Sequence, residues 1–426
     1  MNEVQIYRSV GEYRHYSYCR FCLSSQLAPV INLGYVPLAG GFLKSQKSFK
    51  KEKFYPLELC FCPNCYLLQT NNVVNRDILF KDYYYYSSAI KTLVAFFESV
   101  SIELQNIYMH GDVGKKFIVE IGCNDGTMLQ LIKEKGFKVL GIDPASNIVK
   151  PLIKRGYPII NNYFSEKIAK IIIEKYGKAD AIVSFNTLAH IEDMHDIAKG
   201  IKILLKKDGF LAFGVHYLGN LIKETQYDII YHEHQYYYSL LALKNFFSMY
   251  DMIIYDVKPI NIHAGSMVYY VQNKKYGKRK ISKAVTALIK KERELKLHKM
   301  ETYIQLSKQI QKTKIDLITL LKKLKKENKI IAGYGASGRG TTIMSYCGLD
   351  ERFLNYIVDD APAKQGRFTP GNHFKIFSPS LLKTRSKPDY VLLFAWSFLN
   401  EIFKKNKVYL QNKGRFIIPL PKPRIL

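Results

Sequence analysis

The chain has 426 residues, which is long for a single domain, so we expect two or three domains. Hydrophobic residues make up 47% of the chain, and this content excludes global disorder. No apolar run reaches the roughly 18 residues of a membrane span, and the polar start "MNEVQIYRSVGEYRHY" lacks the apolar middle of a secretory signal. These features predict a cytoplasmic protein that does not interact with membranes.

The net charge of +28 allows two interpretations. One is binding of nucleic acid through its phosphates. The other is a basic background that attracts smaller polyanions, such as a nucleotide diphosphate. Lysine is densest in residues 273–329, where apolar residues recur at helical spacing, as in "IDLITLLKKL". This pattern favours helices with a solvated basic face, so we expect no nucleic-acid partner.

The first segment, residues 1–80, carries two C-x2-C knuckles, Cys19-Arg-Phe-Cys22 and Cys62-Pro-Asn-Cys65. Each short loop presents two thiolates to one corner of a tetrahedron, so the pair predicts a zinc site with ligands Cys19, Cys22, Cys62 and Cys65. Cys60 is a nearby fifth thiol that competes as a ligand, but it does not fit the knuckle spacing. Four thiolates close the coordination sphere, which indicates a structural zinc ion.

The second segment, residues 81–272, alternates strands and helices. Residues 115–136 predict a strand, a glycine turn and a helix, and further strands are expected within 137–145, 179–193 and 209–219. Such alternation predicts a parallel, doubly wound sheet. "MIIYDVKP" and "GSMVYYVQ" predict a terminal antiparallel pair.

The glycine turn Glu120-Ile-Gly122-Cys-Asn124-Asp125-Gly126 differs from the G-x-G-x-x-G pattern that seats a pyrophosphate. This acidic turn suits a cofactor with a positive centre and no phosphate, and Asp143, after the next strand, is placed to bind ribose hydroxyls. S-adenosylmethionine meets these demands, although Asp143 has an alternative role as a helix cap. The predicted cofactor-binding residues are Glu120, Gly122, Asn124, Gly126, Asp143 and Asn186.

The third segment, residues 273–426, begins with the basic helices and continues with strand, glycine turn and helix in "KIIAGYGASGRGTTIMSYCGL". Further strands in 356–377, "DYVLLFAWS" and "RFIIPLP" predict a second Rossmann-like sheet. The turn matches the looser dinucleotide pattern, with a purely structural turn as the alternative, and nearby basic residues support an anion site at the helix start. The predicted substrate-binding residues are Gly335, Ser337, Arg339, Asp359, Lys364 and Arg367.

Six motifs occur in the order found in deoxysugar C-methyltransferases: the paired knuckles, "EIGCNDGTML", "FNTLAHIED", "YHEHQYYYS", "IAGYGASGRGTT" and "VDDAPAKQGRFTPG". The chain resembles this family over essentially its whole length. The resemblance implies a small zinc-binding N-terminal domain, a central class I methyltransferase Rossmann-like sheet and a second Rossmann-like α/β domain. It also implies a monomer that uses S-adenosylmethionine to methylate a ring carbon of a dTDP- or GDP-linked 4-keto-deoxysugar held between the domains.

By motif, the resemblance implies the catalytic residues Tyr85, His190, Tyr231, Glu233 and His234, with Tyr83, Tyr84 and Tyr86 as alternatives to Tyr85. A histidine is free to act as a base near neutrality, so we expect His234 to remove a proton alpha to the ketone, with Glu233 orienting it or binding a sugar hydroxyl. Tyr231 and His190 are expected to donate toward the keto oxygen or enolate.

Other residues near these motifs carry weaker signals. His232 is expected to point away if the loop is extended, and His216 and His263 have no motif support and are interpreted as polar or packing residues. Arg339 stands where lysine is commoner in the family, which leaves the nucleotide open. Two other functions stay possible, a zinc-containing RNA or DNA methyltransferase and a non-catalytic scaffold.

Overall fold

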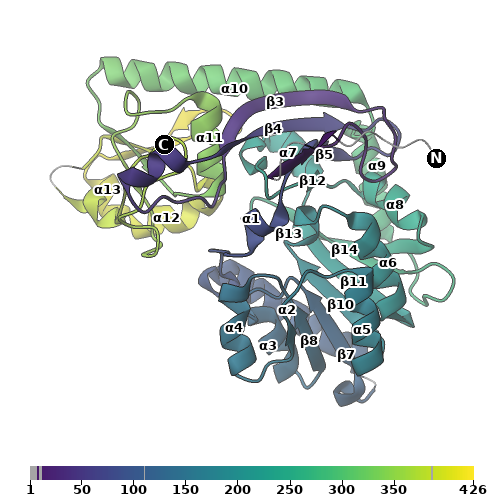
Figure 1. Ribbon diagram of the computed structural model, residues 1–426. Coiled ribbons are helices and arrows are strands. Elements are labelled where there is room, and N and C mark those ends of the chain that lie inside the picture. The colour runs from purple at the N-terminus through teal and green to yellow at the C-terminus, as the bar shows by residue number, and fades with distance from the viewer. Residues whose placement is uncertain (1–6, 9–11, 110, 385–386) are drawn as a thin grey trace.

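The computed structural model describes residues 7–8, 12–109, 111–384 and 387–426, and most of the polar start lies outside them. Three bodies surround a common centre (Figure 1). None of the helices in the described ranges is long and apolar enough to cross a membrane.

The N-terminal body contains two small sheets. One has the order β1-β2-β6 and the other β12-β5-β4-β3. Their strands are β1 (Tyr7–Arg8), β2 (Tyr13–His15), β3 (Ala28–Pro37), β4 (Phe54–Phe61), β5 (Leu68–Thr70), β6 (Asn72–Val74) and β12 (Tyr236–Tyr237). The long antiparallel pair β3–β4 reaches from the N-terminal body to the C-terminal one (Figure 1). A short helix, α1 (Arg76–Phe80), then leads the chain toward the central body.

The central body is a seven-stranded sheet of order β13-β14-β11-β10-β7-β8-β9. Its strands are β7 (Phe117–Ile121), β8 (Lys138–Ile142), β9 (Ile159–Ile160), β10 (Ala179–Phe185), β11 (Leu205–His216), β13 (Met252–Ile260) and β14 (Ser266–Asn273). The strands from β9 to β11 are parallel and the pair β13–β14 is antiparallel, as predicted. Every residue of β10 is buried, as expected for a parallel strand covered on both faces.

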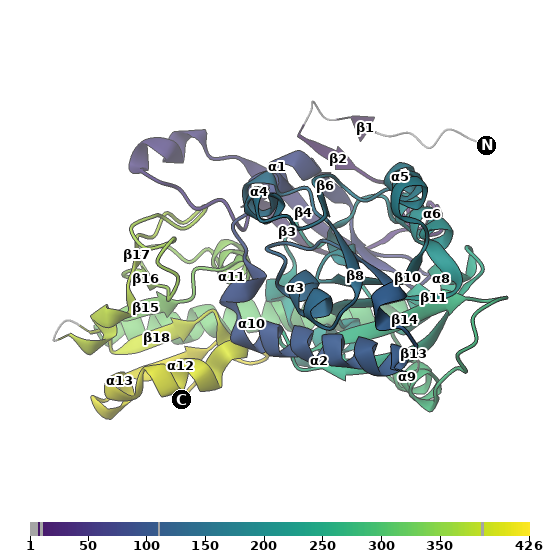
Figure 2. The ribbon, with the colours of Figure 1, turned by 90° about the horizontal axis from the view of Figure 1, so that it is seen from below.

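Helices cover both faces of the central sheet. On one face α2 (Lys91–Tyr108), seen along its length in Figure 2, packs with α3 (Thr127–Glu134). On the other face lie α5 (Glu166–Tyr176), α6 (Met194–Leu204) and α8 (Leu240–Ser248). The remaining helices are α4 (Ser146–Lys154) and α7 (Leu218–Glu224). Helix α8 begins after Ser239, whose hydroxyl caps it by accepting from the amide of Ala242.

The C-terminal body is a six-stranded sheet of order β17-β16-β15-β18-β19-β20. Its strands are β15 (Ile331–Tyr334), β16 (Ile357–Val358), β17 (Ile376–Phe377), β18 (Tyr390–Leu393), β19 (Arg415–Ile418) and β20 (Arg424–Ile425). Its helices are α11 (Gly338–Cys347), α12 (Leu399–Lys405) and α13 (Lys407–Gln411). All pairings except β19–β20 are parallel, as in a Rossmann-like sheet.

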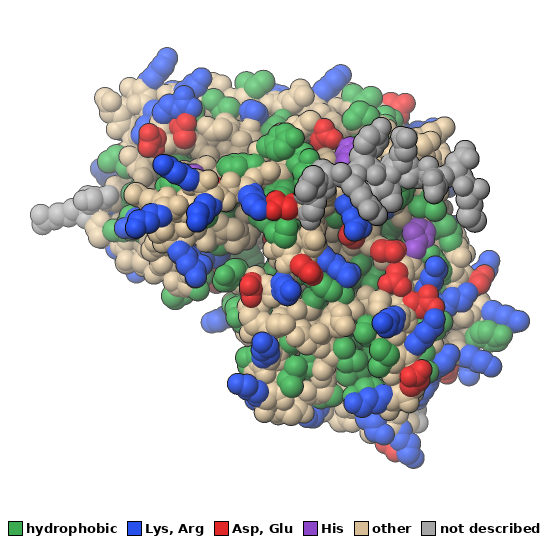
Figure 3. All heavy atoms as spheres, viewed as in Figure 1, with side chains coloured by type: hydrophobic (Ala, Val, Ile, Leu, Met, Phe, Trp, Pro, Cys, Tyr) green, Lys and Arg blue, Asp and Glu red, His purple; other side chains and the backbone are tan. Residues whose placement is uncertain are grey.

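The basic segment forms α9 (Lys283–Glu294) and α10 (Met300–Lys326), as predicted. The buried face of α10 shares one hydrophobic cluster with β3, β4 and α11. This shared core joins the N-terminal and C-terminal bodies. On the face in Figure 3, lysine and arginine side chains are scattered over all parts of the surface and do not gather into one stripe.

Candidate active site

A single cavity of about 2530 Å³ opens where the three bodies meet. Its walls come from the carboxyl edge of the central sheet, the loops after β3 and α1, and the start of α11. It exceeds the roughly 300–1,000 Å³ of a usual small-molecule pocket. The volume therefore accommodates two ligands side by side.

The four predicted zinc ligands come together away from this cavity. The Sγ atoms of Cys19, Cys22, Cys62 and Cys65 all lie within 4.8 Å of one another. Zn–S bonds of about 2.3 Å at tetrahedral angles place sulfurs about 3.8 Å apart, so the cluster fits zinc without rearrangement. Buried Cys60 on β4 is not part of this group. Four sulfur ligands leave no open position, which agrees with a structural role.

The glycine turn after β7 forms one end of the cavity. Gly122 has φ of +78°, and a Cβ there would lie 2.1 Å from Oγ1 of Thr187. The Asn124 amide donates to Oδ2 of Asp143 over 2.9 Å, and the Ala145 amide donates to Oδ1 over 2.9 Å. Asp143 therefore braces the two turns and also lines the cavity, while α4 begins after Ala145 without a side-chain cap, so ribose binding by Asp143 stays a prediction. The backbone cradle and the acidic group fit S-adenosylmethionine.

The other predicted cofactor residues divide into two groups. Asn186, at φ of 54° after β10, lines the cavity with Gly122, Asn124 and Asp143. Glu120 and Gly126 do not line it. Glu120 lies beneath the turn, where its Oε2 has no hydrogen-bond partner within the described structure. Burial, and then the neighbouring Asp143, raise the pKa of its carboxyl well above the ordinary value.

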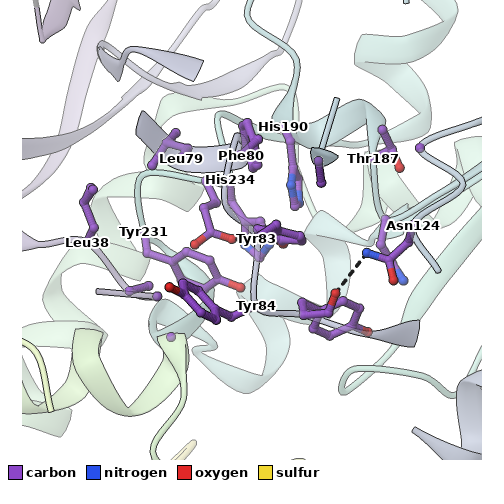
Figure 4. A pocket seen from close by; sticks show the side chains of 18 of the residues that line it. Leu38, Leu79, Phe80, Tyr83, Tyr84, Asn124, Thr187, His190, Tyr231 and His234 are labelled. Atoms are coloured by element: carbon purple, nitrogen blue, oxygen red, sulfur yellow. Dashed lines mark hydrogen bonds between the residues drawn. The ribbon is translucent and has the colours of Figure 1, made fainter. Parts of the chain in front are cut away.

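His234 lies at the centre of the cavity (Figure 4). Its Nδ1 lies 2.7 Å from the carbonyl oxygen of Ile229, an acceptor that can only receive a proton. This contact fixes the tautomer, so Nε2 carries the lone pair. Burial, and then the nearby His190, lower the pKa of His234 well below its ordinary value. At neutral pH the ring is therefore uncharged and able to accept a proton.

Glu233 lies beside His234 and contacts a tyrosine from another part of the chain. The hydroxyl of Tyr83 donates to its Oε2 over 3.3 Å. Burial raises the pKa of Glu233 to about 7, although the Tyr83 hydrogen bond acts in the opposite direction. A carboxyl with a pKa near neutrality can act as either acid or base at working pH.

Three further histidines gather around His234. The ring centroids of His190 and His216 lie 5.0 and 4.9 Å from that of His234, and His263 lies 5.9 Å from His216. Burial lowers the pKa of both His190 and His263 to about 4. The sequence indicated no role for His216 and His263 beyond that of polar or packing residues, and the structure places both on the wall of the cavity. They lie on or beside β11 and β14, and the sequence around them carried no signal.

His232 points away from the cavity, toward the N-terminal body. Its Nε2 lies 3.3 Å from the carbonyl oxygen of Tyr55. Tyr231 faces the cavity, with its ring centroid 4.1 Å from that of His234. The loop is a turn, closed by the His234 amide donating to the Tyr231 carbonyl over 2.9 Å, so His232 points away as expected although Glu233 and His234 both line the cavity.

The tyrosines of "DYYYYSS" form a wall of the cavity, and Figure 4 shows Tyr83 and Tyr84 near Tyr231. Tyr85, the predicted catalytic residue, lies with its hydroxyl 3.5 Å from Nε2 of His263. Tyr83 is the tyrosine that reaches Glu233. Two of the four tyrosines thus contact polar groups of the cavity: Tyr83 contacts Glu233, and Tyr85 contacts His263.

The far end of the cavity lies at the start of α11. Ser337 caps this helix by accepting from the amide of Gly340, and Gly335 turns the chain at φ of +99°. Lys364 donates to the Ala336 carbonyl over 2.7 Å and lies 3.4 Å from Asp359. The Arg367 guanidinium lies over the ring of Tyr84 at 5.6 Å. All six predicted substrate-binding residues line the cavity: Gly335, Ser337, Arg339, Asp359, Lys364 and Arg367.

Arg339 does more than line the cavity. Its guanidinium donates to Oδ2 of Asp228 over 3.1 Å and to the His263 carbonyl over 2.7 Å. Trp396 Nε1 donates to the same Asp228 oxygen over 2.7 Å. Asp228 is fully buried. The Asp228 carboxylate therefore already pairs with the guanidinium of Arg339, which the sequence predicted to bind an anion of the substrate.

Three family models match consecutive parts of the chain: a zinc binding domain over residues 19–80, a methyltransferase domain over 93–252 and a "C-methyltransferase C-terminal domain" over 261–421. The chain is 31% identical over 410 residues to C-methyltransferase NovU of Streptomyces niveus, covering 96% of each protein. It is 25% identical over 116 residues to the ubiquinone biosynthesis O-methyltransferase of Chromobacterium violaceum, covering 26% of this chain and 49% of that one. A solved structure of magnesium protoporphyrin IX methyltransferase from Synechocystis PCC 6803 with bound SAM covers 42% of this chain and 78% of its own, at 13% identity and a TM-score of 0.31.

Proposed function

Because this chain belongs to the family of C-methyltransferases with an N-terminal zinc-binding domain, we propose that it methylates a ring carbon of a nucleotide-linked 4-keto-deoxysugar. The enzyme class and the fold class predicted from the sequence are confirmed: it is an S-adenosylmethionine-dependent methyltransferase with a class I methyltransferase sheet. Its cofactors are S-adenosylmethionine and a structural zinc ion. The sugar substrate, its nucleotide and the catalytic roles below are proposed.

The environment of His234 is the observation that carries the proposal. A neutral imidazole with Nε2 free and Nδ1 held by a carbonyl is prepared to remove a proton from carbon. Such a proton is acidic enough only beside a carbonyl group whose developing enolate oxygen is stabilised. A keto-sugar supplies that carbonyl group. Methylation of a hydroxyl or an amine forms no enolate, so it would not need the hydrogen-bond donors that lie beside His234.

Three neighbouring groups are available to stabilise the enolate. Tyr231 and His190 line the same wall as His234, and burial raises the pKa of the Tyr231 phenol, so both act as neutral donors. Glu233, with a pKa of about 7, holds a sugar hydroxyl or receives the proton from His234. Bound S-adenosylmethionine supplies the electrophilic methyl group. The protein's own part is to hold the ring carbon in line with that group, since positioning supplies much of the acceleration.

The far end of the cavity supports a nucleotide diphosphate. The amides at the start of α11 and the Lys364 and Arg367 side chains surround one region of the wall. Helix starts and cations of this kind bind phosphates. The volume of about 2530 Å³ leaves room for a cofactor and a sugar nucleotide together. A dTDP or a GDP carrier fits this description equally.

The test is incubation of the enzyme with methyl-labelled donor and a panel of dTDP- and GDP-linked 4-keto-deoxysugars, followed by mass spectrometry. We expect the label on a ring carbon beside the ketone, and we expect solvent deuterium to enter at that carbon without donor. His234→Ala should keep donor binding and lose both reactions. A parallel incubation replaces the sugars with total RNA, and label in that RNA, with none in any sugar, would overturn the proposal in favour of a nucleic-acid substrate.

A further inference from the structure

The loop that carries His234 continues directly into the sheet of the zinc-binding body. Strand β12 pairs antiparallel with β5, with Tyr236 opposite Gln69 and Tyr237 opposite Leu68. The amide of Thr70 also donates to the Gln235 carbonyl over 3.0 Å. β5 itself begins three residues after Cys65. The acid–base loop is therefore anchored, at its C-terminal end, on a strand that the second zinc knuckle holds.

Gln235 ties the two histidine loops together. Its amide donates to the Ala189 carbonyl over 2.8 Å, and its side-chain Nε2 donates to the His190 carbonyl over 3.0 Å. Gln235 is 1% exposed and directly follows His234. Gln235 is thus the link nearest to the two histidines, and the Tyr236 and Tyr238 hydroxyls add further bonds to the Glu192 and Leu188 carbonyls.

Arg20 holds the remaining polar atom of the Gln235 side chain. Its guanidinium donates to Gln235 Oε1 over 2.7 Å and to the Thr70 carbonyl over 2.9 Å, and it lies 4.3 Å from the Tyr236 ring centroid. No ion pair joins Arg20 to a carboxylate within the described ranges, although it is only 4% exposed. Burying a cation without a counter-ion is costly. The hydrogen bonds to Gln235 and Thr70 offset part of the free-energy cost of burying the Arg20 guanidinium.

Arg20 also lies between two zinc ligands, Cys19 and Cys22. The knuckle turn fixes its backbone, and its amide donates to Oε1 of Gln69 over 3.0 Å. The path from the zinc cluster to the catalytic centre is therefore short: Cys19, Arg20, Gln235 and then His190 and His234.

We propose that Arg20 and Gln235 are positioning residues through which the zinc knuckle holds His190 and His234 in their working arrangement. This inference rests on the acid–base roles proposed above. The zinc-binding body then does more than stabilise the fold, because it sets the geometry of the reaction. A displacement of about 1 Å at a reacting group costs about 100-fold in rate, so loss of Gln235 should lower kcat with little change in donor binding.

The first measurement needs no substrate. Long-range proton–nitrogen NMR of protein labelled with 15N-histidine reports which nitrogen of each ring carries the proton, and His234→Ala identifies the signals of His234. In the wild type we expect Nδ1 protonated and Nε2 free. In Gln235→Leu, which keeps the side-chain size without the side-chain hydrogen bonds, we expect the ring signals of His190 and His234 to shift, because the spacing of their loops changes, with zinc content and donor affinity unchanged.

The second measurement is turnover by the same variants. We expect kcat of Gln235→Leu and Arg20→Leu to fall about 10- to 100-fold, with KM for the donor within about threefold. The double variant should be no worse than either single one, because both remove the same link. Arg20→Lys should recover part of the rate, since an ammonium still reaches Gln235 Oε1.

The matched control is Asn245→Ala, which removes a different contact to the zinc knuckle, the 3.4 Å bond to the Cys65 carbonyl. It should leave the His234 signals and kcat unchanged. The inference is overturned if Gln235→Leu leaves the His234 signals as in the wild type, or if Asn245→Ala alters them equally. Turnover that survives in His234→Ala would instead overturn the proposed acid–base role, whatever the signals show.

Discussion

Replacing Glu233 with glutamine tests whether its carboxyl is the group that titrates near neutrality in the cavity. Glutamine keeps the shape and an acceptor oxygen for Tyr83, so the pH-independent contacts largely cancel. Burial raises the pKa of Glu233 from 4.5 to about 7. Between these values the folded protein binds more protons than the unfolded chain. The stability that this proton contributes is present at low pH and is lost as the pH rises through about 7.

The size of the effect follows from the two pKa values. Relative to full protonation, the ionisation of Glu233 costs about 1.4 kcal/mol of folding stability at about pH 5.5 and about 3.4 kcal/mol at about pH 8.5. The Glu233→Gln variant should therefore gain about 2 kcal/mol over the wild type between these two conditions. For a cooperative unit of about 150–250 residues this corresponds to about 4–8 °C in Tm.

The assay is thermal melting of both proteins at several pH values. The control is Glu166→Gln on the surface of α5, which removes the same charge where a hydrogen bond from Lys170 lowers the carboxyl pKa. Its effect has the opposite sign, because stability held by a lowered pKa is lost as the pH falls. A Tm difference for Glu233→Gln that stays constant with pH would refute the raised pKa and the role built on it.

Four further predictions follow from the described contacts. Cys62→Ala should lose zinc, as measured by atomic absorption, and should lose folded protein with it, because structural zinc contributes directly to folding. Asp143→Ala should weaken donor binding in calorimetry by about 10-fold, the loss of roughly one charge-assisted hydrogen bond. Asp228→Asn should cost about 3–5 kcal/mol in unfolding, since it leaves the buried Arg339 without its counter-ion. The acid limb of kcat should lie at higher pH than that of kcat/KM, because bound phosphate charge raises the pKa of His234 in the complex.

Most elements of the central sheet could be predicted from local sequence patterns. The alternation of apolar strands with amphipathic helices predicted β7, β8, β10 and β11 and the antiparallel pair that follows, and these elements are present. The knuckle spacing predicted the four-cysteine cluster. Such signals lie within short stretches of sequence, where side-chain period and turn chemistry determine the local structure.

Contacts between distant segments could not be predicted in the same way. β12 has only two residues, and it forms because Tyr236 meets Gln69 across 166 intervening residues. Arg339 was assigned to an anion from its place after a glycine turn, but tertiary packing sets it against Asp228. Tertiary packing likewise places His263 on the wall of the cavity, which no local pattern predicted. A motif locates the loop on which a residue sits, whereas the partner of that residue depends on how the three bodies pack together.

The charge state of the cavity decides which group can act. Burial lowers the pKa of His190 and His263 to about 4, and that of His234 lies well below its ordinary value, so these rings are neutral in the free enzyme. A base with so low a pKa removes a proton from carbon poorly. The proposed nucleotide diphosphate would bring negative charge into the same cavity, and such charge raises the pKa of buried imidazoles. On the function proposed above, the substrate would thus strengthen the base that acts on it, whereas S-adenosylmethionine alone would bring no such charge. Deuterium exchange should accordingly require the diphosphate and should be absent from the free sugar at equal occupancy.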